Sequence, residues 1–121
     1  MICVIGDLIR DIYLYGEIQK ISPEYPIPIF KKLSQSEKLG GAGNVANNLA
    51  ALGSEVKVYG TNNSTKYRYV CDNHIMFRMD EESYIPNQQS PDYDLTGIKY
   101  CIISDYNKGY VDNSQQIIDY C

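Results

Sequence analysis

Three glycines in four positions, followed by an asparagine, open an alanine-rich run. They are Gly40, Gly41, Gly43 and Asn44, in the segment KLGGAGNVANNLAALG. Glycines at a helix start let backbone N–H groups approach a ligand closely, and the helix dipole favours electronegative atoms there. The Asn44 side chain adds a donor and an acceptor suited to a sugar hydroxyl. The same glycines could instead pack a helix tightly on a sheet, and on their own they favour neither interpretation.

Two carboxylates, Asp7 and Asp11, follow the apolar run MICVIG. In open α/β sheets, ligands bind at the carboxyl ends of the strands. A carboxylate held there can accept hydrogen bonds from two adjacent hydroxyls, as carbohydrate recognition requires. The alternative is that Asp7 caps a turn and that Asp11 is solvated.

Charged residues farther along the chain are candidates for contacting an anion. In the segment SDYNKG, Asp105 and Lys108 could contact phosphate or metal-bound water, or they could form a turn with a solvated lysine. Lys66 and Arg68 alternate along a predicted strand, so they share one face and could meet an anionic substrate. Arg78 and Asp80 on the following strand extend this set, for which a solvated sheet face is the alternative. The one histidine, His74, is interpreted as structural or exposed.

The elements that must position these residues alternate between strands and a helix, which predicts an α/β fold in one domain, residues 1–121. Core elements are predicted at 2–6, 42–52, 55–59 and 99–103. The helix would place Val45, Leu49 and Leu52 on one face and stop at Gly53.

Extended segments without intervening helices predict an accessory sheet at 12–20, 27–33 and 66–80. The first reads as an exposed or edge strand, and the prolines of the second allow only an edge strand or a loop. Asp72-Asn73 would form the tight turn of the third. Residues 83–97 read as loop, and 112–121 could begin a helix capped by Asp112 or Asn113.

Composition excludes several classes of protein. The net charge is −4 and no basic run exceeds Lys31-Lys32, which argues against nucleic-acid binding. No apolar stretch approaches the roughly 20 residues that span a bilayer. The four cysteines show no CxxC spacing, so we expect a reduced cytoplasmic protein without a zinc site.

The segment GGAGNVANN resembles the N-terminal signature of the ribokinase-like (PfkB-type) carbohydrate kinases. Three further segments are similar to the heptose 7-phosphate kinase branch of that family, in the same order along the chain. They are GDLIRDIYLYGEIQKISPEYPIP, TKYRYVCDNHIMFRMD and IISDYNKG. This resemblance covers most of the chain and implies a partial ribokinase-like αβα core with a β-sheet lid.

The resemblance also implies roles for individual residues. Asp11 would bind sugar hydroxyls, and Gly40, Gly41 and Asn44 would line the same pocket. Polar residues near the phosphorylated sugar would be Lys66, Arg68, Asn73 and Arg78, and a loop facing the site would carry Asp105 and Lys108. The lid strands would close over the sugar and, as in many relatives, make a dimer contact.

The chain departs from the family pattern in three ways. Only TNNS stands between Gly60 and Thr65, where the family inserts a helix and a strand. The C-terminal nucleotide-binding half, with its catalytic GAGD segment, has no counterpart here, so we expect a truncated module without catalytic residues. In the hairpin, Asp72 replaces a basic residue and His74-Ile75 replaces a Gln-Gln pair, which puts the sugar specificity in question.

Two functions remain open. The chain could be the sugar-binding half of an ATP-dependent carbohydrate kinase acting on a sugar phosphate such as heptose 7-phosphate, inactive alone. Alternatively, it could be a non-catalytic remnant that binds sugar phosphates, dimerises or regulates. In either case we expect no cofactor or metal in this chain alone, ATP and Mg²⁺ belonging to a complete kinase. We also expect a homodimer or a complementary C-terminal half, because a half-fold exposes a sheet edge.

Overall fold

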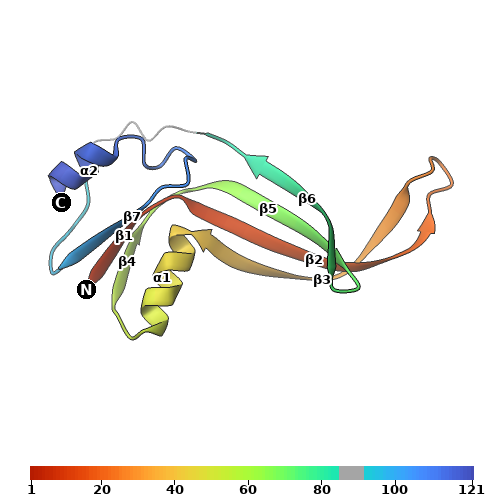
Figure 1. Cartoon of the computed structure of the whole chain (residues 1–121), viewed down its shortest axis with the longest axis horizontal. Coiled ribbons are helices and arrows are strands. Elements are labelled where there is room, and N and C mark those ends of the chain that lie inside the picture. Colours follow the sequence, from red (N-terminus) through yellow and green to blue (C-terminus); the bar gives the residue numbers. More distant parts are fainter. Residues whose placement is uncertain (85–91) are drawn as a thin grey trace.

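A computed structural model describes residues 1–84 and 92–121; the predicted loop at 83–97 lies partly outside them. The chain forms two sheets that extend in different directions from one junction (Figure 1). The core sheet has three parallel strands in the order β4-β1-β7, namely Val56–Tyr59, Ile2–Gly6 and Tyr100–Ser104. These strands lie within one residue of the segments predicted at 2–6, 55–59 and 99–103, because short apolar runs bounded by polar residues are strong strand signals.

Helix α1 (Ala42–Ala51) covers one face of the core sheet, where Val4 packs against Ala42 and Ala46. Val45 and Leu49 join this cluster as predicted. Leu52, which we predicted on the same face, is instead exposed because it is the C-cap, beyond the last helical turn. Gly53 then ends the helix with a positive φ of 88°.

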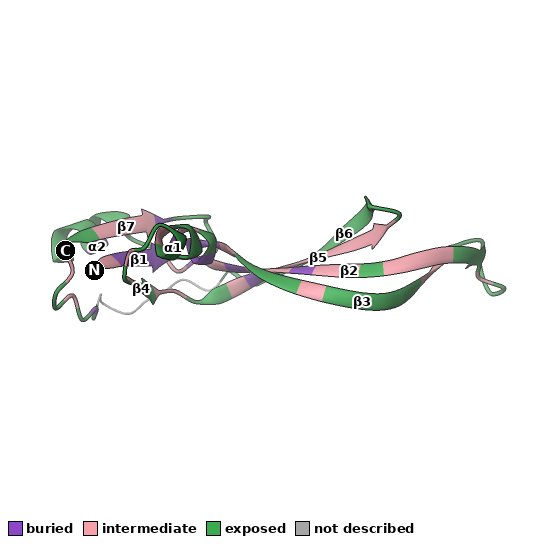
Figure 2. Ribbon diagram, turned by 90° about the horizontal axis from the view of Figure 1, so that it is seen from below, coloured by how far each residue is buried: buried purple, intermediate pink, exposed green. Residues whose placement is uncertain are grey.

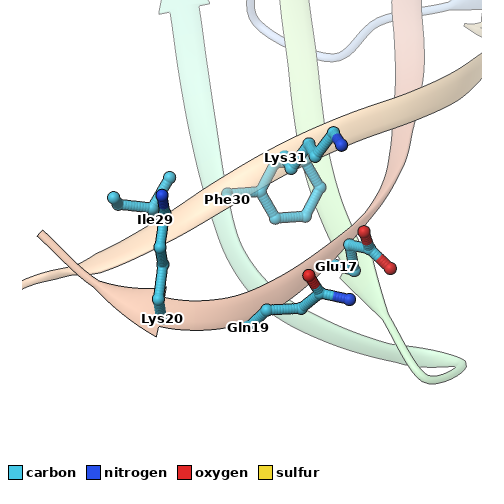
Figure 3. Close-up of a pocket in the computed structure, with 6 residues that line it drawn as sticks. All are labelled: Glu17, Gln19, Lys20, Ile29, Phe30 and Lys31. Atoms are coloured by element: carbon cyan, nitrogen blue, oxygen red, sulfur yellow. The ribbon is translucent and has the colours of Figure 1, made fainter.

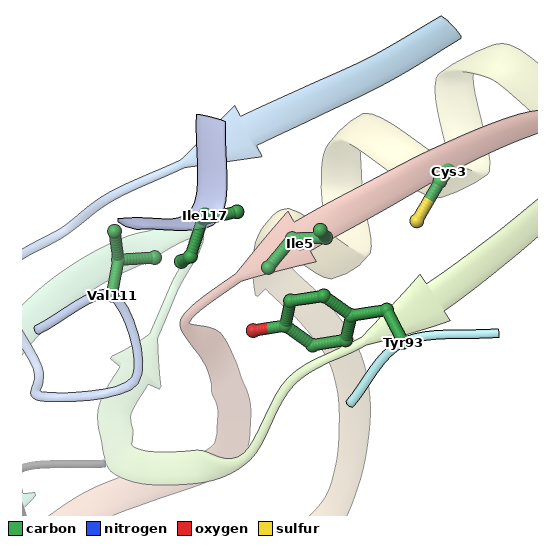
Figure 4. Packing of buried hydrophobic residues seen from close by; sticks show 5 residues of the cluster. All are labelled: Cys3, Ile5, Tyr93, Val111 and Ile117. Atoms are coloured by element: carbon green, nitrogen blue, oxygen red, sulfur yellow. The ribbon is translucent and has the colours of Figure 1, made fainter. Parts of the chain in front are cut away.

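The opposite face of the core sheet carries a second cluster of five buried residues, shown in Figure 4: Cys3, Ile5, Tyr93, Val111 and Ile117. Ile117 comes from helix α2 (Ser114–Tyr120). That helix begins with Asn113 as its N-cap, and the Asn113 side chain accepts a hydrogen bond from the Gln116 N–H at 3.1 Å. The small core is therefore covered on both faces.

The outer sheet has four strands in the order β3-β2-β5-β6 and projects from the core as a long, largely exposed arm (Figure 2). The strands are Pro28–Gly41, Leu8–Ile21, Asn62–Cys71 and His74–Glu82. β3 is an edge strand, as its proline content predicted. The prediction of an edge position for β2 is wrong, because β2 pairs with β3 on one side and with β5 on the other.

The turn between β5 and β6 is formed by Asp72 and Asn73, both with positive φ. Such φ values at both central residues match the right-handed twist of a two-residue hairpin, and Asn and Asp tolerate them well. This turn was predictable from the dipeptide alone.

At the junction between the two sheets the backbone comes close to itself, and Leu8 packs there against the core cluster. A Cβ added to Gly60 would lie 2.3 Å from the Gly6 carbonyl oxygen, and one added to Gly6 would meet the Ser104 carbonyl. Glycine is required at both positions because neighbouring backbone segments of the chain are in direct contact there. The two sheets therefore meet where the backbone comes close at Gly6 and Gly60.

The architecture agrees with the predicted α/β class, with two sheets and two helices over the described residues. In the same part of the chain, no helix is long and apolar enough to cross a membrane.

Candidate functional site

One face of the outer sheet, which we call the polar face, gathers charged side chains from all four strands. Residues opposite one another in paired strands point to the same face of the sheet, so the strand register determines which residues lie on the polar face. β5 and β6 contribute the pairs Ser64 with Glu82, Lys66 with Asp80, and Arg68 with Arg78. Asp11 and Tyr13 of β2 lie beside them, and Lys38 and Gly40 of β3 complete the face.

Asp11 and Arg68 form an ion pair near the middle of this face. Arg68 Nη1 donates to Asp11 Oδ1 at 2.8 Å, and about a fifth of each side chain is exposed. The Arg68 guanidinium also lies 5.3 Å from the centroid of the Tyr13 ring, in a cation–π contact. The hydrogen bond to Asp11 raises the pKa of Arg68. Both members of the pair border water, so a ligand can reach them.

Gly40 lies directly beside this carboxylate. A Cβ on Gly40 would come within 2.6 Å of Asp11 Oδ2, so only glycine leaves the second carboxylate oxygen uncovered on that side. The family resemblance implied that Asp11 and Gly40 line one pocket, which stays a prediction; the structure places Gly40 beside the Asp11 carboxylate.

A chain of alternating charges links β6 to the loop after β7. Lys108 Nζ donates to Glu82 Oε1 at 2.6 Å, and Ser64 Oγ lies 3.1 Å from the same oxygen. Lys66 Nζ lies 3.9 Å from Glu82 and 3.8 Å from Asp80. The hydrogen bond from Lys108, followed by that from Ser64, lowers the pKa of Glu82. Predicted site residues separated by about 40 positions, Lys66 and Lys108, therefore share one acidic partner.

Arg78 extends this chain of charges at its outer end, where its guanidinium pairs with Asp80 at 2.8 Å. Lys66, Arg68, Arg78 and Lys108 are thus each paired with a carboxylate, whereas Lys38 Nζ lies 5.6 Å from the centroid of the Tyr13 ring. An incoming anion would have to displace a carboxylate from any of the paired cations.

Four predicted site residues lie away from Asp11. Asn73 is exposed at the hairpin tip, seven positions along the chain from Lys66. Asn44 is exposed in the first turn of α1. Gly41 is buried at the helix N-cap, and Asp105 binds its own loop by accepting the Asn107 N–H at 2.8 Å. The first helical N–H group, that of Ala42, donates to the Asp7 carbonyl at 2.9 Å.

Asp7 has a role that sequence reasoning recognised only in outline. Its side chain is fully buried, and its carboxylate accepts the N–H groups of Tyr106, Lys108 and Tyr110 at 2.8, 3.3 and 3.0 Å. It therefore organises the loop after β7 and positions the backbone of Lys108. The available signal was a carboxylate directly after a buried strand, which we also read as a turn cap.

A separate open hollow of about 510 Å³ lies toward the far end of the β2–β3 ribbon (Figure 3). Six residues line it: Glu17, Gln19, Lys20, Ile29, Phe30 and Lys31. No sequence pattern predicted this hollow, because its lining comes from two strands that pairing brings together.

Within the described residues, no group of three His, Cys, Asp or Glu side chains is placed to hold a metal ion. On the polar face carboxylates and cations alternate. Its chemistry suits hydroxyl groups at Asp11 and one compact anion at the cations.

Comparisons with known proteins give a consistent result, although no family model matches the chain. The bifunctional protein HldE of Helicobacter acinonychis is 54% identical over 59 residues, which cover 49% of this chain and 13% of that protein. The bifunctional protein HldE of Nitrosococcus oceani is 32% identical over 152 residues, covering 97% of this chain and 32% of the relative. The D-beta-D-heptose 7-phosphate kinase of Bordetella bronchiseptica is 46% identical over 59 residues, covering 49% of this chain and 19% of that kinase.

These matches confirm the similarity to heptose 7-phosphate kinases that the motifs indicated. The chain spans less than a third of the length of the relatives that it matches. The match with the Nitrosococcus protein runs over 152 residues, more than the 121 of this chain, so the relative carries inserted residues within the aligned region.

Proposed function

We propose that this chain, a homologue of part of the proteins named HldE and D-beta-D-heptose 7-phosphate kinase, is the sugar-binding part of a ribokinase-like sugar-phosphate kinase. The observation that carries the proposal is the Asp11–Arg68 pair on a solvent-facing sheet, beside the uncovered edge at Gly40. A carboxylate for hydroxyls and a guanidinium for an anion, 2.8 Å apart, match the two kinds of group that a sugar phosphate carries.

In this proposal Asp11 accepts hydrogen bonds from two neighbouring sugar hydroxyls and thereby orients the ring. Arg68, with Lys66 and Arg78, receives the phosphate of the substrate. Asp7 holds the loop that presents Lys108, and the outer sheet serves as the lid over the sugar. Four other residues would contact the sugar phosphate only when that lid closes: Gly41 and Asn44 at the start of α1, Asn73 at the hairpin tip, and Asp105.

Phosphoryl transfer itself needs a base and an anion hole for the transferred group. The residues that the resemblance assigns to these roles form a GAGD segment, which does not occur in these 121 residues. We therefore assign binding and orientation of the sugar to this stretch, and no step of phosphoryl transfer. We expect the 121 residues by themselves to bind substrate without turnover.

Isothermal titration with heptose 7-phosphate tests the proposal. We expect saturable binding that weakens at least tenfold in Asp11→Asn, since a charge-assisted hydrogen bond is lost. Glu55→Gln is the matched control, because it neutralises an exposed carboxylate just before β4, in the core sheet and not on the polar face. Equal binding in both variants, or none in the wild type, would contradict the proposal.

A second function, that of a sugar-phosphate-binding assembly module, is favoured by the opposite face of the outer sheet. Phe77 and Met79 of β6 are about half exposed there, and Phe77 stacks on Tyr69 with ring centroids 4.2 Å apart. A second copy of this chain could cover them. Light scattering should then show a dimer that Phe77→Ser weakens, and a wild-type monomer at high concentration would rule this module out.

A further inference from the structure

Two cysteines that are far apart in the sequence meet at the end of the core remote from the outer sheet. Cys101 lies on β7, and Cys121 follows helix α2. The Cys121 Sγ lies 3.6 Å from the Cys101 Sγ, and both residues are free thiols. A disulfide needs about 2.0 Å between the sulfurs, so a small movement of the Cys121 side chain and backbone would bring the pair to bonding distance.

The surroundings of the two thiols differ in a way that suits stepwise oxidation. Cys101 packs at the border of the cluster in Figure 4, with Cys3 opposite it on β1. Cys121 is exposed, so a small oxidant can reach it first. Partial removal from water raises the pKa of Cys101 and brings that of Cys121 to about 11. Both sulfurs are therefore thiols rather than thiolates at neutral pH, and exchange speeds up as the pH rises.

We propose that Cys101 and Cys121 form a disulfide that fastens helix α2 to the core sheet, with a small-molecule disulfide such as oxidised glutathione as the oxidant. The Cys121 thiolate attacks one sulfur of the oxidant, forming a mixed disulfide and releasing one glutathione thiol. The Cys101 thiolate then attacks the Cys121 sulfur, forming the intramolecular bond and releasing the second glutathione. Two protein thiols are oxidised, one glutathione disulfide is reduced to two thiols, and the protons of the protein thiols end on the glutathiones.

This bond would close a loop of 20 residues that contains the segment held by Asp7 and bearing Lys108. Closing a loop restricts the unfolded chain more than the folded one. The oxidised protein should therefore resist unfolding of the segment between Cys101 and Cys121, which also presents Lys108 to Glu82. This inference does not depend on the proposed function.

Oxidation followed by tryptic mapping tests the proposal. The protein is incubated at pH 8.5 with oxidised glutathione, alkylated and digested without reduction. The lysines and arginines place the four cysteines in four separate tryptic peptides, 1–10, 69–78, 100–108 and 109–121. We expect peptides 100–108 and 109–121 to be joined, with a mass two hydrogens below their sum, and the Tm to rise by about 10 °C.

Two variants provide the controls. Cys121→Ser should lose both the linked peptides and the rise in Tm, whereas Cys71→Ser, which removes a thiol on the outer sheet, should keep both. Linkage of 1–10 or 69–78 to another peptide would overturn the proposal. Recovery of four alkylated cysteines after oxidation would overturn it as well.

Discussion

The two sheets of this chain are stabilised by different means. In the core sheet, Cys3, Val4 and Ile5 of one short strand are completely buried between two layers. In the outer sheet, β6 is exposed along its whole length, and the backbone ladders between the strands are supplemented by ion pairs and aromatic stacking. Burial of apolar surface gives the core its stability, whereas cross-strand pairs of a fraction of a kcal/mol each hold the arm. The core should therefore unfold cooperatively, and the arm should open locally at lower cost.

The largest effect should come from Asp7→Ala in the core. Three N–H groups would lose a buried acceptor, which costs roughly 3 to 5 kcal/mol of unfolding free energy. Urea unfolding followed by circular dichroism measures the loss. Glu55→Ala, which removes an exposed carboxylate, should change the midpoint little; a similar loss in both variants would argue against the Asp7 contacts as its cause.

A smaller loss of unfolding free energy is expected from Gly41→Ala at the junction. Gly41 has a φ of 58°, and a Cβ there would lie 2.3 Å from the Asp7 carbonyl oxygen, so the change should cost about 2 to 3 kcal/mol. Gly53→Ala is the matched control, because its φ is also positive but open space surrounds it. We expect about 1 kcal/mol there. Equal losses of unfolding free energy in the two variants would show that the positive φ, and not the contact with the Asp7 carbonyl, causes the destabilisation.

In the arm, Phe77→Ala should remove the stack on Tyr69 and cost about 1 kcal/mol. The measurement is hydrogen exchange, in which amides of β5 and β6 should exchange faster while those of β1 keep their protection. Faster exchange in β1 as well would mean that the two sheets unfold as one unit.

Arg68→Gln should change stability by less than about 1 kcal/mol and change binding more. The variant frees Asp11, so we expect heptose 7-phosphate to bind about tenfold more weakly while the unphosphorylated sugar binds as well as before or better. Arg10→Gln is the control, since Arg10 pairs with Glu37 on the opposite face of the same sheet. If titration shows the same change for both sugars, Arg68 does not contact the phosphate.

The smallest expected effect is on the acid dependence of the Tm in Glu82→Gln. The pKa of Glu82 is lowered by Lys108, so its contribution is present above about pH 4.5 and is lost as the pH falls through the lower folded value. The Tm of the wild type should fall slightly more between pH 6 and 3.5 than that of Glu82→Gln. Identical acid profiles would show that the Lys108–Glu82 pair contributes nothing to the connection between core and arm.

How far the sequence could predict this structure depends on how local each feature is. The helix at Ala42–Ala51 and the turn at Asp72-Asn73 follow from residues within a few positions of each other. The inner position of β2 depends on its parallel pairing with β5, between residues more than 50 positions apart, which no local pattern encodes.

The candidate site shows the same division. Asp11, Arg68 and Lys108 were chosen by residue type and resemblance, but their partners were not predictable. Arg68 lies 57 positions from Asp11, and the amide of Tyr110 lies 103 positions from Asp7. The carboxylate after the first strand has the same sequence signature whether it binds a ligand or a loop. Only the fold distinguishes the two cases: Asp7 is buried and binds the loop after β7, whereas the Asp11 side chain is partly exposed.

The close backbone contact at Gly6 and Gly60 marks the base of the arm. The strands β2 and β3 have 14 residues each, so the arm reaches on the order of 45 Å from that base. Strand β2 begins directly after Asp7, which follows the carboxyl end of β1. Anything that binds near the far end of the arm therefore acts on a long element whose base adjoins the buried Asp7 and the loop that it holds.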